Sequence, residues 1–139
     1  MIRKEPFSEP TTFSFSSSKR LLSASDYSKV FDDAPIRASH KCALILSRPN
    51  NLDHARLGLV VAKKNVRFAV ARNQFKRLTR ESFRLKQHQL PAIDAIVLAR
   101  RGADTLTNVE LSRILNGLWK HIIKQAKKHE SQKNTQSEQ

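Results

Sequence analysis

The chain has 139 residues, of which 26 are Lys or Arg and 12 are Asp or Glu, so its formal net charge is +14 at pH 7. This length allows one small domain around a single core. With only three glycines the glycine-rich phosphate loops of nucleotide-binding folds are excluded, and with one cysteine an internal disulfide is excluded. So large a positive charge indicates a polyanionic partner, either nucleic acid or an anionic membrane surface.

Both ends of the chain are predicted to lie outside the folded domain. Residues 1–20 are rich in Ser, Thr and Pro, lack the apolar stretch of a signal peptide, and are expected to form a flexible extension. Residues 127–139 are polar throughout and are expected to form a disordered tail. A single α/β domain is therefore assigned to residues 21–126. No segment is long and apolar enough to span a bilayer, and without a signal peptide we expect a cytoplasmic protein. No membrane partner is expected, because the basic helix described below has no Trp- or Leu-rich face left once its apolar stripe is buried.

The first predicted element is a short helix that ends near Asp32. It follows an approximate capping box, Ser23-Ala24-Ser25-Asp26. Tyr27 and Phe31 lie on one side of this helix, and their helical spacing favours a place in the core. Aromatic side chains beside a basic groove also stack on unpaired bases, so this alternative stays open.

Two apolar strands are predicted next, at residues 41–46 and 57–62, and the turn residues between them predict a hairpin. Cys42 falls within the first apolar run and is expected to be a buried, structural thiol. A third buried strand is expected at residues 94–99.

A long helix is predicted from about residue 70 to Pro91. Phe83 falls about 120° away from the apolar stripe, among basic residues, and is expected to close a groove rather than enter the core. A last helix begins at the capping box Thr107-Asn108-Val109-Glu110. This element order predicts a sheet covered by helices. The predicted core stripe of the long helix is Ala71, Phe75, Leu78, Ser82 and Leu85, and that of the last helix is Leu111, Ile114, Leu115, Leu118, Ile122 and Ala126.

Half of the net charge lies in residues 63–84, which contain eight Lys or Arg residues and only one acidic residue, Glu81. Four of these cations follow one another at every fourth position and form a ridge opposite the apolar stripe: Arg72, Lys76, Arg80 and Arg84. Like charges at this spacing destabilise a helix by about 0.2 to 0.5 kcal/mol a pair. The ridge therefore favours contact with nucleic acid over the alternative of a solvated basic face.

No side chain of the protein is assigned to catalysis or to a metal. Glu81 is surrounded by cations that hold it ionised, and neither a pair of carboxylates nor a His-Ser-Asp arrangement is apparent. The five histidines do not have the spacing of a zinc site.

The runs GLVVAKKN at residues 58–65 and ARNQFKRLTRESFR at residues 71–84 resemble the protein subunit of bacterial ribonuclease P, and the resemblance extends over residues 21–123. It implies a small α/β sandwich like the RNA-binding fold of ribosomal proteins, with a left-handed strand-helix-strand crossover in place of the usual right-handed one. It also implies a catalytic RNA partner that removes the 5′ leader of precursor tRNA with Mg²⁺ held mainly by the RNA. No small-molecule cofactor is expected.

The resemblance assigns roles to residues at matching positions. It places Tyr27 and Phe31 in a leader-binding cleft, which reverses the preference for the core, and Lys63, Lys64 and Arg67 beside the same path. Gln74 stands where the family usually has Arg and is expected to contact RNA less strongly. Two other functions stay open: a structural or ribosomal RNA-binding protein and a protein-only nuclease. The residues assigned to the catalytic RNA are Arg72, Asn73, Lys76, Arg77, Arg80 and Arg84.

Overall fold

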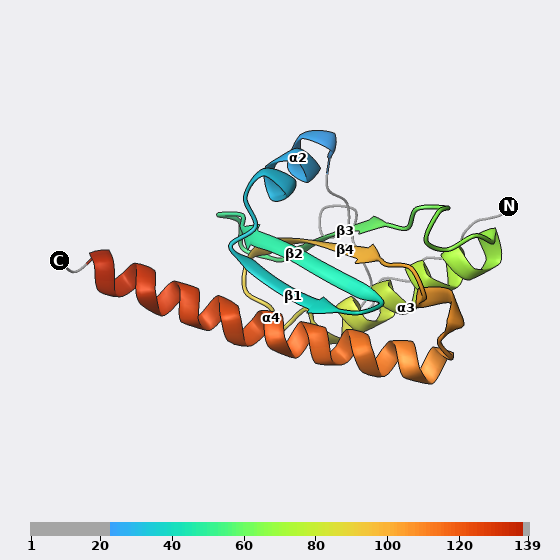
Figure 1. Cartoon of the computed structure of the whole chain (residues 1–139). Coiled ribbons are helices and arrows are strands. Elements are labelled where there is room, and N and C mark those ends of the chain that lie inside the picture. The colour runs from blue at the N-terminus through green and yellow to red at the C-terminus, as the bar shows by residue number, and fades with distance from the viewer. Residues whose placement is uncertain (1–22, 138–139) are drawn as a thin grey trace, which may run out of the picture.

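The computed structural model describes residues 23–137, with side chains through residue 130, and the predicted N-terminal extension lies outside this range (Figure 1). A four-stranded sheet lies between one short helix and two longer ones. The elements in chain order are α2 (Ala24–Asp32), β1 (Ile36–His40), β2 (Ala43–Pro49), β3 (Arg56–Val60), α3 (Ala69–Lys86), β4 (Ile93–Ala99), the 3₁₀ turn η1 (Ala103–Thr105) and α4 (Asn108–Ser137).

The sheet has the order β1-β2-β4-β3, with β3 parallel to β4 and the other neighbours antiparallel. The predicted α/β sandwich is therefore confirmed. The predicted hairpin between β2 and β3 is wrong, because β4 lies between them. The helix α3 makes the parallel connection from β3 to β4, and the left-handed sense of that crossover stays a prediction.

The real hairpin joins β1 and β2, and β1 was not predicted. This strand contains only two buried apolar residues, Ile36 and Ala38, which alternate with exposed Arg37 and Ser39. Such a short alternating run beside Pro35 gives a weak signal in sequence. β4 gives a stronger one, since six of its seven residues are buried, as predicted.

The helices are divided between the two faces of the sheet (Figure 1). α3 and α4 cover one face and share the main core with residues such as Ile45, Leu57 and Val97. α2 lies on the other face, where Val30 and Ala34 pack on Ile96. The second face is therefore covered by one short helix only.

The buried side of α3 is wider than predicted. Phe75, Leu78 and Ser82 are buried as expected, but Phe83 is also fully buried, so its prediction was wrong. The Phe83 ring lies 5.6 Å from the ring of Trp119 on α4, because α3 packs on this helix as well as on the sheet. Leu85 was assigned to the core, but it is 52% exposed, because the buried side of α3 is formed by Thr79 and Phe83 in its place. The helix also ends at Lys86, before the predicted end at Pro91.

Both predicted capping boxes are present. The Ser23 hydroxyl accepts the Asp26 N–H while the Asp26 carboxylate accepts the Ser23 N–H. At the start of α4, Thr107 and Glu110 exchange the equivalent two hydrogen bonds, at 2.9 and 3.1 Å. α4 continues to Ser137, so the chain is helical in a region that was expected to be a disordered tail. No Gly or Pro lies between Gly117 and Ser137, so this part of the sequence contains no strong helix breaker.

Candidate nucleic-acid interface

The six residues assigned to the catalytic RNA all lie on α3. Asn73, Arg77 and Arg80 are exposed, and Arg72, Lys76 and Arg84 are half-buried. The first turn of α3 contains no acidic residue, and the side that packs against the core contains no charged residue. The helix therefore separates its cations from the core and presents them together.

Arg72 has a second role that its spacing did not reveal. Its guanidinium donates to the backbone carbonyls of Val66 and Arg67, at 3.1 and 2.7 Å. These bonds hold the loop between β3 and α3 against the start of the helix. The burial of the Val66 side chain fixes the same loop to the core. Part of the charge of Arg72 is thus used to stabilise the loop that contains Arg67.

Two other members of the set interact along the helix. Arg84 forms an ion pair with Glu81 at 2.6 Å, so the only carboxylate of this helix offsets the last cation of the ridge. The Nε of Arg77 donates to the Oε1 of Gln74 at 3.4 Å. Gln74 also lines a small cavity of about 110 Å³ between α3 and the start of α4. Its weaker contact with RNA stays a prediction.

On the opposite face of the sheet, the phenol of Tyr27 is fixed to β3. Its oxygen accepts the Leu59 N–H at 2.9 Å and lies 3.4 Å from the Leu59 carbonyl. A Cβ at Gly58 would lie 2.8 Å from this ring, so the absence of a side chain there lets the ring lie against the strand. Tyr27 is therefore half-buried and held in one orientation.

Phe31 lies one helical turn beyond Tyr27 and remains 50% exposed. The two rings have centroids 6.4 Å apart and an interplanar angle of 24°. Half-buried apolar side chains of the sheet, Val60 and Leu98, also pack in this region. The structure thus brings together two stacked aromatic rings beside an apolar sheet surface, which is an arrangement suited to unpaired bases.

Lys63, Lys64 and Arg67 are exposed on the loop between β3 and α3. The side-chain amide of Asn65 donates to the Ala99 carbonyl at 3.1 Å and ties this loop to the end of β4. Sequence reasoning missed Phe68, which is 63% exposed and lies 5.4 Å from the guanidinium of Arg67. Phe68 directly precedes the predicted helix, where an aromatic residue is usually part of the core, so nothing in the sequence assigned it to a binding surface.

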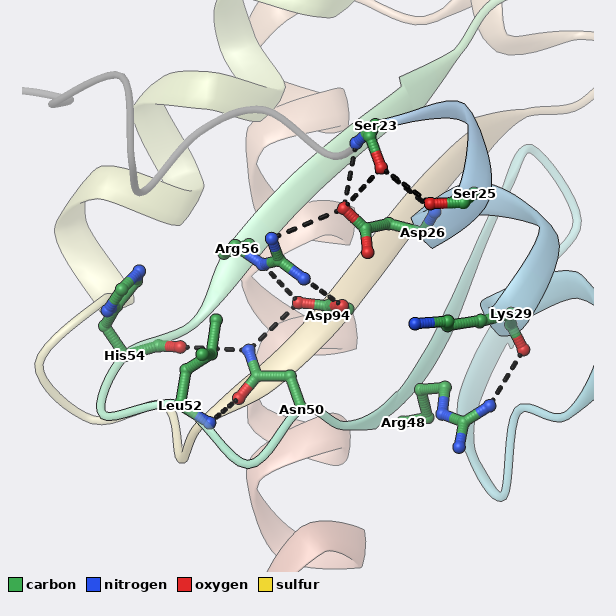
Figure 2. Close-up of polar contacts among 10 residues, drawn as sticks. All are labelled: Ser23, Ser25, Asp26, Lys29, Arg48, Asn50, Leu52, His54, Arg56 and Asp94. Atoms are coloured by element: carbon green, nitrogen blue, oxygen red, sulfur yellow. Dashed lines mark hydrogen bonds and ion pairs between the residues drawn. The ribbon is translucent and has the colours of Figure 1, made fainter.

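A polar network fixes α2 to the sheet (Figure 2). Arg56 on β3 donates twice to Asp94 on β4, at 2.8 and 2.7 Å, and lies 3.3 Å from Asp26 on α2. Asn50 donates to Asp94 at 2.9 Å, and Arg48 donates to the Lys29 carbonyl at 3.1 Å. The network thus links both ends of α2 to three strands or their ends, although none of these contacts was predicted.

This network also changes the acidity of its members. The Ser23 N–H, the Ser23 hydroxyl and the nearby Arg56 charge lower the pKa of Asp26, with burial opposing them. The hydrogen bonds from Arg56 to Asp94 raise the pKa of the guanidinium. Each charge is therefore stabilised by its partner, as expected for an ion network that is largely removed from water.

Among the residues that the structure describes, neither a cluster of metal-ligating side chains nor a membrane-spanning helix is present. No group of three or more His, Cys, Asp or Glu side chains among these residues is placed to hold a metal ion. Within the same range, no helix has both the length and the apolarity to cross a bilayer.

Comparison with known proteins relates this arrangement to one family. The ribonuclease P family model matches residues 15–123. The ribonuclease P protein component of Saccharophagus degradans is 63% identical over 116 residues, covering 84% of this chain and 86% of that protein. The equivalent component of Pseudomonas aeruginosa is 47% identical over 117 residues, covering 84% and 87%.

Solved structures agree with the sequences. The RNase P protein of Staphylococcus aureus is 29% identical, with a TM-score of 0.64, and the match covers 78% of this chain and 94% of that one. The protein from Thermotoga maritima is 27% identical, with a TM-score of 0.58 over 72% and 97% of the two chains. The chain therefore belongs to the ribonuclease P protein family, the protein components of an endoribonuclease holoenzyme that processes tRNA.

Proposed function

We propose that this protein binds the RNA component of ribonuclease P through the cations of α3 and the 5′ leader of precursor tRNA on the sheet face that carries α2. In this family the RNA carries out the cleavage, and the reaction is generally dependent on Mg²⁺. The protein contributes affinity for precursor tRNA and positions it on the catalytic RNA. The assignment of each residue to one of the two RNAs is part of this proposal.

The exposed Phe31 ring, stacked near a fixed Tyr27, is the observation that carries the leader assignment. The exposed part of the Phe31 ring is available to a ligand, and a base that stacks on it adds favourable binding free energy. Stacking of this kind contributes about 1 to 3 kcal/mol per base and tolerates any sequence. Leader sequences can then differ while their mode of binding stays the same.

The charge on α3 supports the second assignment. Phosphate contacts position a protein on folded RNA without reading its sequence, and a rigid helix presents such contacts at fixed spacing. α3 and α2 lie on opposite faces of the sheet (Figure 1), so the protein can contact the catalytic RNA and the leader at the same time.

Phe31→Ala tests the leader assignment. We expect the assembled holoenzyme to bind precursor tRNA about 5- to 150-fold more weakly, the equivalent of one lost stacking contact. Binding of mature tRNA, which has no leader, should be unchanged. Leu85→Ala removes a side chain of similar exposure, 52%, from the opposite side of the molecule and is the matched control. Both affinities are measured by titration of labelled tRNA with holoenzyme.

Equal losses for precursor and mature tRNA would contradict the leader assignment. Two further reactions address the other functions. Cleavage of precursor tRNA by the protein without RNA would indicate a protein-only nuclease. An RNA-catalysed rate that the protein does not alter would indicate a structural RNA-binding protein.

A further inference from the structure

A second basic site lies at the end of the sheet, in a cavity of about 480 Å³. The cavity is bounded by the β1–β2 turn, the segment that follows β4, and the first turns of α4. Its volume falls within the range of sites that hold a ligand of nucleotide size. It contains none of the residues that the sequence assigned to either RNA.

Three exposed cations from three different segments line this cavity: Lys41, Arg101 and Arg113. None of these three side chains forms an ion pair or hydrogen bond with another residue in the range 23–130. The lining also contains one carboxylate, that of Glu110, which accepts the Thr107 N–H. The charge around the cavity is therefore positive and lacks an internal counterion for at least two of the cations.

The interior of the cavity is not purely ionic. Cys42, 6% exposed, and the half-buried Leu106 and Ile114 contribute an apolar surface. His40 also lines the cavity, and its Nδ1 accepts the Cys42 N–H at 3.0 Å, which leaves Nε2 as the ring nitrogen that is free to donate. A lining that combines exposed cations with an apolar surface matches a nucleotide better than it matches a bare inorganic anion.

The backbone around the cavity is held in place. Arg100 donates its N–H to the Cys42 carbonyl at 2.9 Å and its guanidinium to the His40 carbonyl at 3.0 Å, so the β1–β2 turn is tied to the end of β4. Gly102 has a φ of 97°, a conformation that other residues adopt at a cost. A ligand would therefore meet a site that is already formed.

The β1–β2 turn and the segment after β4, which line the cavity, lie at the same end of the sheet as the loop that contains Lys63, Lys64 and Arg67 (Figure 1). The bond from Asn65 to the Ala99 carbonyl joins that loop to the strand from which the cavity segment leaves. An RNA strand that contacts the start of α3 can therefore reach the cavity without passing to the other end of the molecule.

We propose that this cavity binds one unpaired nucleotide of an RNA strand, with its phosphates on Lys41, Arg101 and Arg113 and its base or ribose against Leu106 and Ile114. The catalytic RNA and precursor tRNA have the same chemistry, and the experiment below separates them. The proposal rests on the RNA-binding function of the protein but is independent of the leader assignment, because it involves no residue of α2.

The test compares the double variant Arg101→Ala/Arg113→Ala with Lys127→Ala/Lys128→Ala. The control removes the same charge from exposed positions on α4 about 20 Å from Arg113. Affinity for ribonuclease P RNA is measured at several monovalent salt concentrations. We expect the cavity variant to flatten the slope of log K against log salt by about 1.4 to 1.8, and the control to leave it unchanged.

Glu110→Gln makes the test sharper, because it keeps the cap of α4 and removes the one carboxylate of the cavity. An RNA phosphate in the cavity should then bind about threefold more tightly. A merely structural role would not give opposite effects for the two substitutions. Equal slopes for the cavity variant and its control with both ribonuclease P RNA and precursor tRNA would overturn the proposal. Weaker RNA binding by Glu110→Gln would also overturn it.

A second arm repeats the slopes with precursor tRNA and the assembled holoenzyme. A change in the first arm assigns the nucleotide to the catalytic RNA, and a change in the second arm alone assigns it to the tRNA. Amide NMR of the free protein then compares a single-stranded RNA pentamer with inorganic phosphate. Larger shifts at Gly102 and Thr105 with the pentamer support a nucleotide, and equal shifts with phosphate contradict it. If Phe31→Ala leaves leader binding unchanged, these results retain their meaning.

Discussion

Gly58 and Tyr27 form a pair in which one residue has no side chain so that the other can lie flat. The bond from the Leu59 N–H to the phenol oxygen requires the ring to lie directly on this part of β3. The role of each residue therefore depends on the other. They are close together because α2 packs on the sheet, and the residue pattern of neither segment predicts that packing.

Gly58→Ala should displace the Tyr27 ring, because its new Cβ would lie 2.8 Å from ring atoms. We expect a loss of about 1 to 3 kcal/mol in the free energy of unfolding, measured by denaturation with urea. The cost should be much smaller when Tyr27 is already Ala, since nothing then occupies the space. Additive losses in this double-mutant cycle would contradict the packing argument.

At the scale of elements, α2 is attached to the sheet by a small apolar contact and a charged network. Arg56 lies between the carboxylates of Asp26 and Asp94, and its side chain is 19% exposed. Removal of one partner from such a network leaves a poorly solvated charge, which is typically costly. The orientation of Tyr27 and Phe31 therefore depends on charges that lie outside the aromatic surface itself.

Asp26→Asn should alter the acid dependence of stability. The pKa of Asp26 is lowered in the folded protein from its ordinary value of 3.8, so its stabilising effect is complete above that pH and is lost as the pH falls through the folded value. We expect the unfolding free energy of the wild type to fall below about pH 4, and that of Asp26→Asn to fall less over the same range.

Asp104→Asn is the matched control, since this carboxylate is exposed and belongs to η1. It should keep the acid dependence of the wild type. The measurement is urea denaturation at intervals between pH 2 and pH 6. The same dependence in wild type and Asp26→Asn would show that the network does not contribute in this way.

The elements differ in how far their sequence predicts them, and the reason is the range of the interactions. Both capping boxes and the apolar stripe of α4 depend on neighbours within about one turn or two, and these were correct. The cations of α3 were placed on one helix for the same reason. The β2–β3 hairpin was wrong, because turn residues after β2 do not reveal that β4 enters between the two strands.

The charged network shows the same limit at the candidate site. Arg56 and Asp94 are opposite each other only in the register of parallel β3 and β4, and α3 separates them in sequence. Phe83 shows it in the core, where a second packing partner, α4, widened the buried side of α3. Each of these features depends on contacts between segments that are far apart in the sequence. The spacing of residues within one segment does not predict such contacts.

At the scale of the whole molecule, charge and stability are separated. The core lies between the sheet and two helices, whereas the cations of α3 lie on its outer side. Loss of such cations should change RNA binding and leave the fold largely intact. Arg72 is an exception, because its bonds to the Val66 and Arg67 carbonyls join the two roles.

Lys76→Ala/Arg80→Ala should therefore weaken assembly with ribonuclease P RNA and flatten the salt slope by about 1.4 to 1.8. The unfolding free energy of the free protein should change by less than about 0.5 kcal/mol. Filter binding at several salt concentrations and urea denaturation give the two quantities. An unaltered slope would remove these residues from the RNA interface, and a large loss of stability would place them in the core.

Trp119 is the only tryptophan of the chain, and it is fully buried between α3 and α4, with its indole N–H donating to the Ser82 hydroxyl at 2.9 Å. Its fluorescence therefore originates from one defined location, on the far side of the sheet from Phe31. Red-shifted emission would signal that the two long helices have separated, whereas a nucleic acid beside α2 would leave the spectrum unaltered. The intrinsic fluorescence of Trp119 thus distinguishes a variant that has unfolded from one that is folded but no longer binds RNA.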